Sequence, residues 1–414
     1  MGTGLENRLD PNMYGRFRTS TLDRDPGLKG IMNPALRTLK SVSTYFAVAL
    51  AVANVGFSTA RAATIHQIDG TGAVTQAAQP SDAAPIQGHR ITIDVVAEDK
   101  LSHPTRGLQA SDFTVLDNNQ SQNLVGFRAM DGNGTTPDPV HILIVVDMIN
   151  CDFTTVARER EQLGEYLNQD SGRLGHPTGL AVLTESGLKM MTGSTLDGKA
   201  LMTNFQKVQT EIRSVGRAAG FYGAAERLEM SLAQLSQLAA YEGTQPGRKM
   251  VLVISPGWPL LSWAGTEEDT KQRAWVFNSI VHLSNGLREA HVALYCLDPF
   301  ELGRTNPFYY QNYLKPVANI GHAEYPDLAL QVLAEHSGGR GLTTGRDILG
   351  EIDTALHDAG SYYELTFEAP TADHPNEYHG LRVKTDKPDL KILTTAGYYA
   401  ETQALAPASG SIKK

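Results

Sequence analysis

Residues 140–147 read VHILIVVD, a continuous apolar run that ends in Asp147. Apolar residues at every position, rather than at alternate positions, are typical of a β-strand that is covered on both faces. Two later segments have the same character, GRKMVLVIS at 247–255 and HVALYCLD at 291–298. The three runs therefore predict the centre of a buried, largely parallel sheet.

Amphipathic segments alternate with these strands through residues 140–360. We expect a strand pair formed by TGLAVLTES and LKMMTG, and helices at 154–168, 197–208, 223–241, 267–289 and around 328–337. In the first helix the apolar face consists of Val156, Leu163, Tyr166 and Leu167. Alternating strands and helices indicate an α/β domain, an open sheet with helices on both faces.

Both flanks of this α/β unit have β character. Residues 88–132 contain three short strand segments separated by turns, and residues 361–400 contain YYELTFEAP, HGLRVKTD and LKILTTAGYYA. The two flanks either form one β domain, into which the α/β unit is inserted, or two separate small units. The sequence leaves both arrangements open, and residues 401–414 are expected to be a disordered tail.

Residues 32–62 have the pattern of a secretory signal peptide. Arg37 and Lys40 precede an apolar stretch from Val42 to Phe57, and Ala60-Arg61-Ala62 fits a small-x-small cleavage site. The stretch is short and rich in Ala for a bilayer-spanning helix, and a retained N-terminal membrane anchor is the alternative. We therefore expect an exported protein that is secreted, periplasmic or part of the cell envelope, without a membrane span after cleavage.

Two further segments surround the signal. Residues 1–31 form a polar leader before the signal, and the sequence leaves both Met1 and Met32 open as the start. Residues 63–87 are rich in Ala, Gln, Thr, Gly and Pro without periodicity, as in a flexible linker.

Charge and cysteine content exclude several classes of protein. Cleavage after Ala62 leaves 352 residues with a net charge of −13, against −9 for the whole chain. Nucleic-acid binding requires clustered cations, and no basic run occurs. Cys151 and Cys296 alone cannot build a disulfide framework or a four-thiolate zinc site. We expect two free, buried thiols, because in the expected sheet another strand lies between the strands that carry Cys151 and Cys296.

Six segments between Gly88 and Ala400 occur in a characteristic order: GLQASDFTVLDNNQSQNLVGF, HILIVVDMIN, GRKMVLVISPGWPL, HVALYCLD, SGGRG and AGYYA. Together they resemble the von Willebrand factor A-related family of acidobacterial secreted proteins. The resemblance implies a Rossmann-like A domain, which binds ligands at the carboxyl ends of its strands. It also implies a metal-ion-dependent adhesion site there, built from D-x-S-x-S, a later Thr and a later Asp.

This chain departs from that ligand pattern. Asp147 matches the first ligand, but Ile149 and Cys151 replace the two serines. Ala219 and Pro256 fall near the positions of the Thr and the second Asp. Because an apolar side chain cannot coordinate Mg²⁺, the adhesion site is expected to be degenerate.

A modified cation site is the alternative at this loop. Asp147, Asn150 and Asp152 form the run D-x-x-N-x-D, whose oxygens could hold Mg²⁺ or Ca²⁺ weakly. In the other interpretation, Asp147 and Asn150 close the strand end through hydrogen bonds to backbone amides. We favour the second, because one short loop offers too few ligands, and we expect no cofactor.

The loop PGWPLLSWAG, residues 256–265, is a candidate partner-binding surface. Its apolar side chains follow a core strand, at the edge where A domains bind ligands, and exposed aromatic residues are frequent interface anchors. The alternative is that they pack beneath the β domain. The candidate anchors are Trp258, Leu260, Leu261 and Trp263.

An enzymatic function is the weakest interpretation. Ser255, with Asp298 and later His residues, has the chain order of a hydrolase triad. A nucleophile elbow needs Gly where Val253 stands, and Pro256 removes the N–H of an oxyanion hole. We therefore expect a non-enzymatic module for protein binding or cell-envelope assembly, with a cation-dependent adhesin as the alternative and a hydrolase as a remote one.

Overall fold

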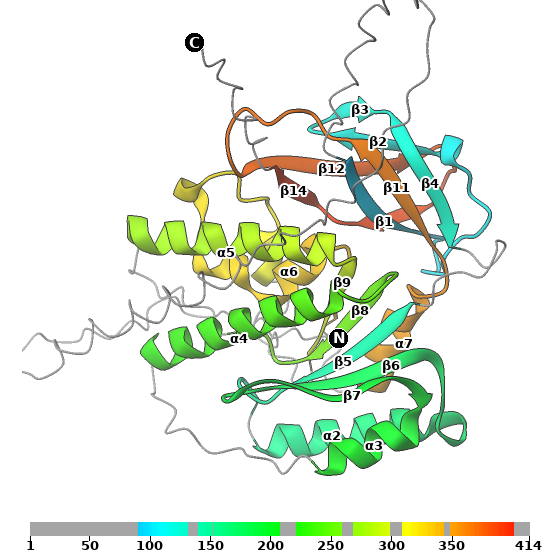
Figure 1. The fold of residues 1–414 in the computed structure, drawn as a ribbon, viewed down its shortest axis with the longest axis vertical. Helices are drawn as coiled ribbons and strands as arrows, with labels where there is room; N and C mark the ends of the chain where they lie inside the picture. Colours follow the sequence, from blue (N-terminus) through cyan, green and yellow to red (C-terminus); the bar gives the residue numbers. More distant parts are fainter. Residues whose placement is uncertain are drawn as a thin grey trace, which may run out of the picture. The chain divides into compact units, whose positions relative to one another are not determined.

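The computed structural model describes most of the chain after residue 89. Three sheets and six helices form this part (Figure 1). The polar leader 1–31, the signal 32–62, the linker 63–87 and the tail 401–414 lie outside the described residues. The described ranges are 90–130, 140–151, 153–207, 221–258, 268–298, 309–342 and 348–400.

The largest sheet has six strands in the order β10-β9-β8-β5-β6-β7. All neighbours are parallel except β6 and β7, which form the predicted strand pair and are antiparallel. Every residue of β8 and β9 is buried, as the continuous apolar runs predicted. The strands are β5 (His141–Asp147), β6 (Arg173–Thr184), β7 (Gly187–Asp197), β8 (Lys249–Ile254), β9 (Val292–Leu297) and β10 (Arg340–Leu342).

Helices cover both faces of this sheet, as predicted. Ile142 and Ile144 of β5 pack with residues of α2, α3 and α7, whereas Leu143 and Val145 pack with residues of α4, α5 and α6. None of the described helices is long and apolar enough to cross a bilayer. The helices are α2 (Phe153–Asn168), α3 (Gly198–Lys207), α4 (Phe221–Glu242), α5 (Thr270–Glu289), α6 (Leu330–His336) and α7 (Ile348–His357).

The two flanks of the α/β unit share two four-stranded sheets. In one sheet, β1 (Arg90–Glu98) lies between β13 (Lys391–Thr394) and β11 (Tyr362–Glu368), which also pairs with β4 (Leu124–Met130). The order of the other is β14-β12-β2-β3, with β14 (Gly397–Ala400), β12 (Glu377–Thr385), β2 (Phe113–Asp117) and β3 (Gln120–Gln122). The pairing corresponds to the first of the two arrangements that the sequence left open.

An apolar core lies between these two sheets. Ile93, Leu365 and Phe367 from the first sheet pack with Val115 and Val383 from the second. The residues that meet come from opposite ends of the chain, so neither flank buries its apolar face alone. We call this pair of sheets the β unit.

The structure differs from the sequence prediction at three short elements. Gly338, with φ +84°, forms the predicted turn, but Arg340–Leu342 continues as strand β10. Helix α7 was not predicted. The closing segment 391–400 was predicted as one strand and is two, because the chain moves from one sheet to the other at Thr395 and Ala396.

A buried ion pair joins the β unit to the edge of the large sheet. Arg340 Nε and Nη2 donate to the two oxygens of Asp358 at 2.8 and 3.0 Å, and Nη2 also donates to Glu98. Tyr295 Oη donates to Asp358 Oδ2 at 2.7 Å. Burial raises the pKa of Glu98 to about 7, and its hydrogen bond to Asp358 acts in the same direction. Glu98 therefore carries a proton in the folded protein at mildly acidic pH.

Glu98→Gln should change how stability depends on pH. The contribution of Glu98 to stability is complete below its unfolded pKa of 4.5 and is lost as pH rises through about 7. The amide of the variant stays neutral at every pH, so the free energy of unfolding of the wild type should fall relative to the variant between pH 5 and pH 8. Urea unfolding at four pH values measures the difference. Glu368→Gln, at the exposed end of β11, is the matched control, and parallel curves for wild type and Glu98→Gln would contradict the prediction.

Candidate functional site

The order of the large sheet reverses between β5 and β8. The chain adds β6 and β7 on one side of β5, and then β8, β9 and β10 on the other. In open α/β sheets, such a reversal leaves a crevice outside the carboxyl ends of the two strands, where ligands bind. Asp147 ends β5, and Ser255 directly follows β8. The candidate site therefore lies around these two residues.

Asp147 is the centre of a hydrogen-bond network and is completely buried. Its Oδ1 accepts from the backbone N–H groups of Ile149 and Asn150 at 2.9 and 3.1 Å. Its Oδ2 accepts from Asn150 Nδ2 at 2.8 Å and from Ser255 Oγ at 2.7 Å. Since a carboxylate has about four lone-pair positions, this carboxylate has no free acceptor position.

The local sequence explains the shape of this loop. An Asp side chain that accepts from the N–H two residues later forms an Asx turn, which ends a strand and reverses the chain. Asp147 makes this bond to Ile149 and a second one to Asn150. The interpretation that Asp147 closes the strand end is confirmed, whereas the Asn150 side chain bonds to other side chains.

Asn150 connects the loop to helix α4. Its Nδ2 donates to Ser231 Oγ at 3.0 Å, and Ser231 Oγ donates to the carbonyl of Arg227 at 2.8 Å. Asn150 Oδ1 is buried and has no hydrogen-bond partner in the described part of the chain. Sequence reasoning did not find Ser231, which stands 81 residues from Asn150. Ala219, expected near the position of the family's Thr, lies outside the described residues.

The surroundings of the site disfavour additional negative charge. Burial raises the pKa of the Asp147 carboxyl above its ordinary value, and the hydrogen bonds from Asn150 and Ser255 act in the opposite direction. Burial also raises the pKa of the Cys296 thiol, and the carboxylates of Asp298 and Glu351 raise it further. A thiolate nucleophile is therefore disfavoured at Cys296.

The predicted cation ligands are only partly brought together. Asp147 and Asn150 are in direct contact, while Asp152 lies outside the described residues. Within the described ranges, no group of three or more His, Cys, Asp or Glu side chains is placed to hold a metal ion. A cation at Asp147 would have to displace hydrogen-bond donors that are already in place.

Ser255 has a structural environment rather than that of a nucleophile. Its side chain is completely buried, and its hydroxyl donates to Asp147. The Ser255 oxygen also accepts from the N–H of Gly257 at 3.1 Å. A nucleophilic serine needs an open side towards substrate and a base to accept its proton. The hydrogen bond between Ser255 and Asp147 was not predicted. The signal for it is a polar residue at the end of a strand adjacent to the Asp147 strand.

The loop after β8 does not present Trp258 as an exposed anchor. Trp258 is 3% exposed and belongs to the apolar core beneath α4, α5 and α6, so the expectation is wrong for this residue. Gly257, with φ +87°, turns the chain inward, and a Cβ there would lie 2.8 Å from Gln331 Nε2. Leu260, Leu261 and Trp263 lie outside the described residues.

The two cysteines are buried and form no disulfide, as expected. Cys151 Sγ donates to Glu159 Oε1 at 3.3 Å, and Cys296 Sγ donates to the carbonyl of Ser255 at 3.8 Å. Each thiol therefore has a hydrogen-bond acceptor of its own. Cys296 therefore contacts the site through the backbone carbonyl of Ser255.

Comparison with known proteins adds no family assignment. The chain matches no protein-family model, and no curated protein matches it in sequence. The relation to von Willebrand A domains therefore rests on the sequence resemblance and stays a proposal.

Ser255→Ala should lower the free energy of unfolding by about 1.5 to 3 kcal/mol, because a hydrogen bond to a buried carboxylate is lost. Asp147→Asn should have a comparable or larger effect, since its amide would place a donor against Asn150 Nδ2. Urea unfolding measures both changes. Ser236→Ala removes an α4 hydroxyl that donates to the helix backbone and should change stability by less than about 1 kcal/mol. A Ser255→Ala variant as stable as this control would contradict the prediction.

Proposed function

We propose that this protein is an exported, non-enzymatic module for protein binding or cell-envelope assembly, built on a von Willebrand A-type sheet. Support for this fold comes from the six-stranded order with its reversal at β5 and β8 and from helices on both faces. The signal-like pattern at 32–62 supports export.

One observation carries the proposal that the module works without a metal ion. The resemblance makes Asp147 the first ligand of an adhesion site, yet four donors surround its carboxylate. Two of these donors, Ser255 Oγ and Asn150 Nδ2, are side chains of the site itself. Direct hydrogen bonds thus occupy the acceptor positions that a cation would need, and partner recognition would depend on surrounding surface rather than on a bridging ion.

A cation-dependent adhesin is the second candidate, and one observation favours it. Asn150 Oδ1 is a buried oxygen without a hydrogen-bond partner among the described residues. Together with Asp152 and water, it would provide oxygen ligands of the kind that Mg²⁺ and Ca²⁺ prefer. Binding would then require Ser255 and Asn150 to turn away from Asp147.

Titration calorimetry separates these two candidates. Mg²⁺, Ca²⁺ and Mn²⁺ should each produce no saturable heat with the wild-type protein, because Asp147 has no free acceptor position. A saturable heat that disappears in Asp147→Ala would establish the adhesin instead.

Capture of partners from an envelope extract tests the binding function itself. The chain from residue 63 onward should retain the same protein in the presence and absence of EDTA. Partner capture that EDTA abolishes would favour the adhesin, and failure to retain any protein specifically would contradict a binding module. Labelling of Ser255 by a fluorophosphonate would contradict the non-enzymatic assignment, and Ser255→Ala is its control.

A further inference from the structure

The last hairpin of the β unit opens and leaves a cleft between its two sides. We call these sides, β12 on the one hand and β13 with β14 on the other, the two legs of the hairpin. Residues 377–380 of β12 pair with 397–400 of β14, but residues 381–385 then pair with β2, while 391–394 pair with β1 in the other sheet. The N–H of Leu381 donates to the carbonyl of Ala396 at 2.9 Å, where the legs part. From Leu381 towards the turn of the hairpin, the two legs therefore no longer pair with each other.

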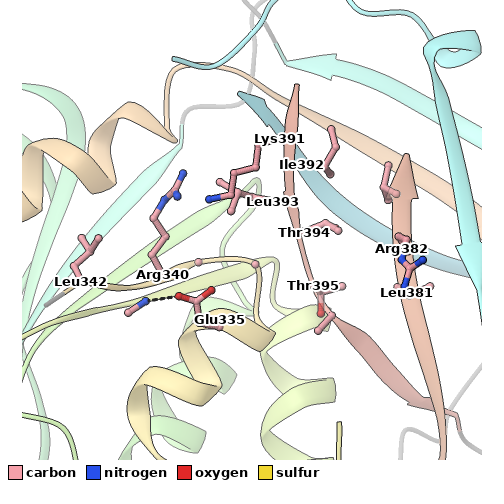
Figure 2. Close-up of a pocket in the computed structure, with 15 residues that line it drawn as sticks. Glu335, Arg340, Leu342, Leu381, Arg382, Lys391, Ile392, Leu393, Thr394 and Thr395 are labelled. Carbon is pink, nitrogen blue, oxygen red and sulfur yellow. Dashed lines mark hydrogen bonds between the residues drawn. The ribbon is translucent and has the colours of Figure 1, made fainter. Parts of the chain in front are cut away.

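The edge of the large sheet closes the third side of the cleft. The cavity has a volume of about 450 Å³ and is lined by both legs, by Glu335 and by the segment 338–342 (Figure 2). A Cβ on Gly338 would lie 2.8 Å from the carbonyl carbon of Thr394, so the turn before β10 approaches β13 closely. This close approach fixes the width of the cleft at its base.

Both legs direct backbone hydrogen-bonding groups into the cleft. Since Leu381 directs its N–H away from β2, the alternation along an antiparallel strand directs the N–H and C=O of Val383 the same way. The carbonyl of Ala97 accepts from Thr105 at 2.6 Å, so its cross-strand partner Ile392 is not bonded to β1 and faces the cleft. Such open strand edges are templates for an added strand.

The edge of β10, by contrast, is protected. Glu335 Oε1 accepts from the N–H of Gly341 at 3.0 Å, and Tyr310 Oη donates to the carbonyl of Gly341 at 3.5 Å. An added strand would therefore pair with β12 or β13 and lie against β10 without pairing to it.

Exposed positive charge faces the cleft. Arg382 and Lys391 are exposed, and neither forms a salt bridge within the described ranges, although Lys391 lies close enough to the buried Glu98 to lower the pKa of that carboxyl. Arg340 also lines the cavity, but its guanidinium is bound to Asp358 and Glu98. Glu335 is the acidic residue of the lining, and it is engaged with Gly341. The net positive lining favours a ligand with carboxylates.

We propose that this cleft binds an extended acidic segment of a partner protein, about three to four residues long, as an added β-strand. Main-chain groups of the segment bond to Ile392 or Val383, and its carboxylates pair with Arg382 and Lys391. The inference rests on the proposed protein-binding function and names a surface and a partner chemistry for it. The Asp147 network takes no part in it.

Fluorescence anisotropy with a labelled peptide, acetyl-Glu-Val-Glu-Val-Glu-Val-amide, tests the proposal on the chain from residue 63 onward. The peptide should bind, and the double variant Arg382→Glu, Lys391→Glu should weaken binding at least tenfold. Lys384→Glu changes an exposed cation on the same face of β12 that does not line the cavity, and it should leave binding within about twofold. Urea unfolding should show that every variant is folded, because the changed side chains are exposed.

A second peptide separates strand addition from simple charge attraction. Acetyl-Glu-Pro-Glu-Pro-Glu-Pro-amide has the same charge but lacks the alternate N–H donors, and it should bind at least tenfold more weakly. Equal binding of the two peptides, effective competition by inorganic phosphate, or equal weakening by Lys384→Glu would overturn the proposal. Absence of peptide binding while the envelope partner is still captured would overturn this cleft and leave the proposed function standing.

Discussion

The buried contacts of Arg340 with Asp358 and with Glu98 connect the two parts of this fold. A charge that leaves water must be paired and hydrogen-bonded, and removal of one partner costs about 3 to 5 kcal/mol. Arg340 comes from the edge strand β10, Asp358 follows α7, and Glu98 ends β1. Of the three, Glu98 belongs to the β unit, so its contact with Arg340 forms only when the β unit lies against this sheet edge. Arg340 also lines the cleft between β12, β13 and β10.

At the carboxyl edge of the sheet a buried charge must also be stabilised, but there hydrogen bonds replace the ion pair. Asp147 is buried without a cationic partner among the described residues, and four hydrogen-bond donors stabilise it instead. The donors come from the following loop and from Ser255 on the neighbouring strand. A position suited to a metal ion in the resembling family is thus occupied by the protein's own groups. The two edges of the molecule therefore offer different chemistry, a closed network at one and an open cationic cleft at the other.

The elements of the large sheet were predictable where their apolar periodicity is strong. The strands β5, β8 and β9 and the helices α2 to α6 follow directly from continuous or 3.6-residue patterns. Strand β10 was not predictable, because three residues that include a glycine carry no periodic signal. Whether Trp258 is exposed or buried was left open by the sequence, since the direction of the chain after Gly257 depends on what lies beneath it.

The amino-acid sequence by itself determined the α/β class, the covered faces of the sheet and the position of Asp147 at a strand end. Each of these follows from hydrophobic burial and backbone geometry within one element. Only the tertiary structure decided that both flanks share one β unit, that Ser255 and Ser231 complete the Asp147 network, and that the legs of the last hairpin part. The physical reason is that these pairings join residues distant along the chain, where no local pattern specifies the partner.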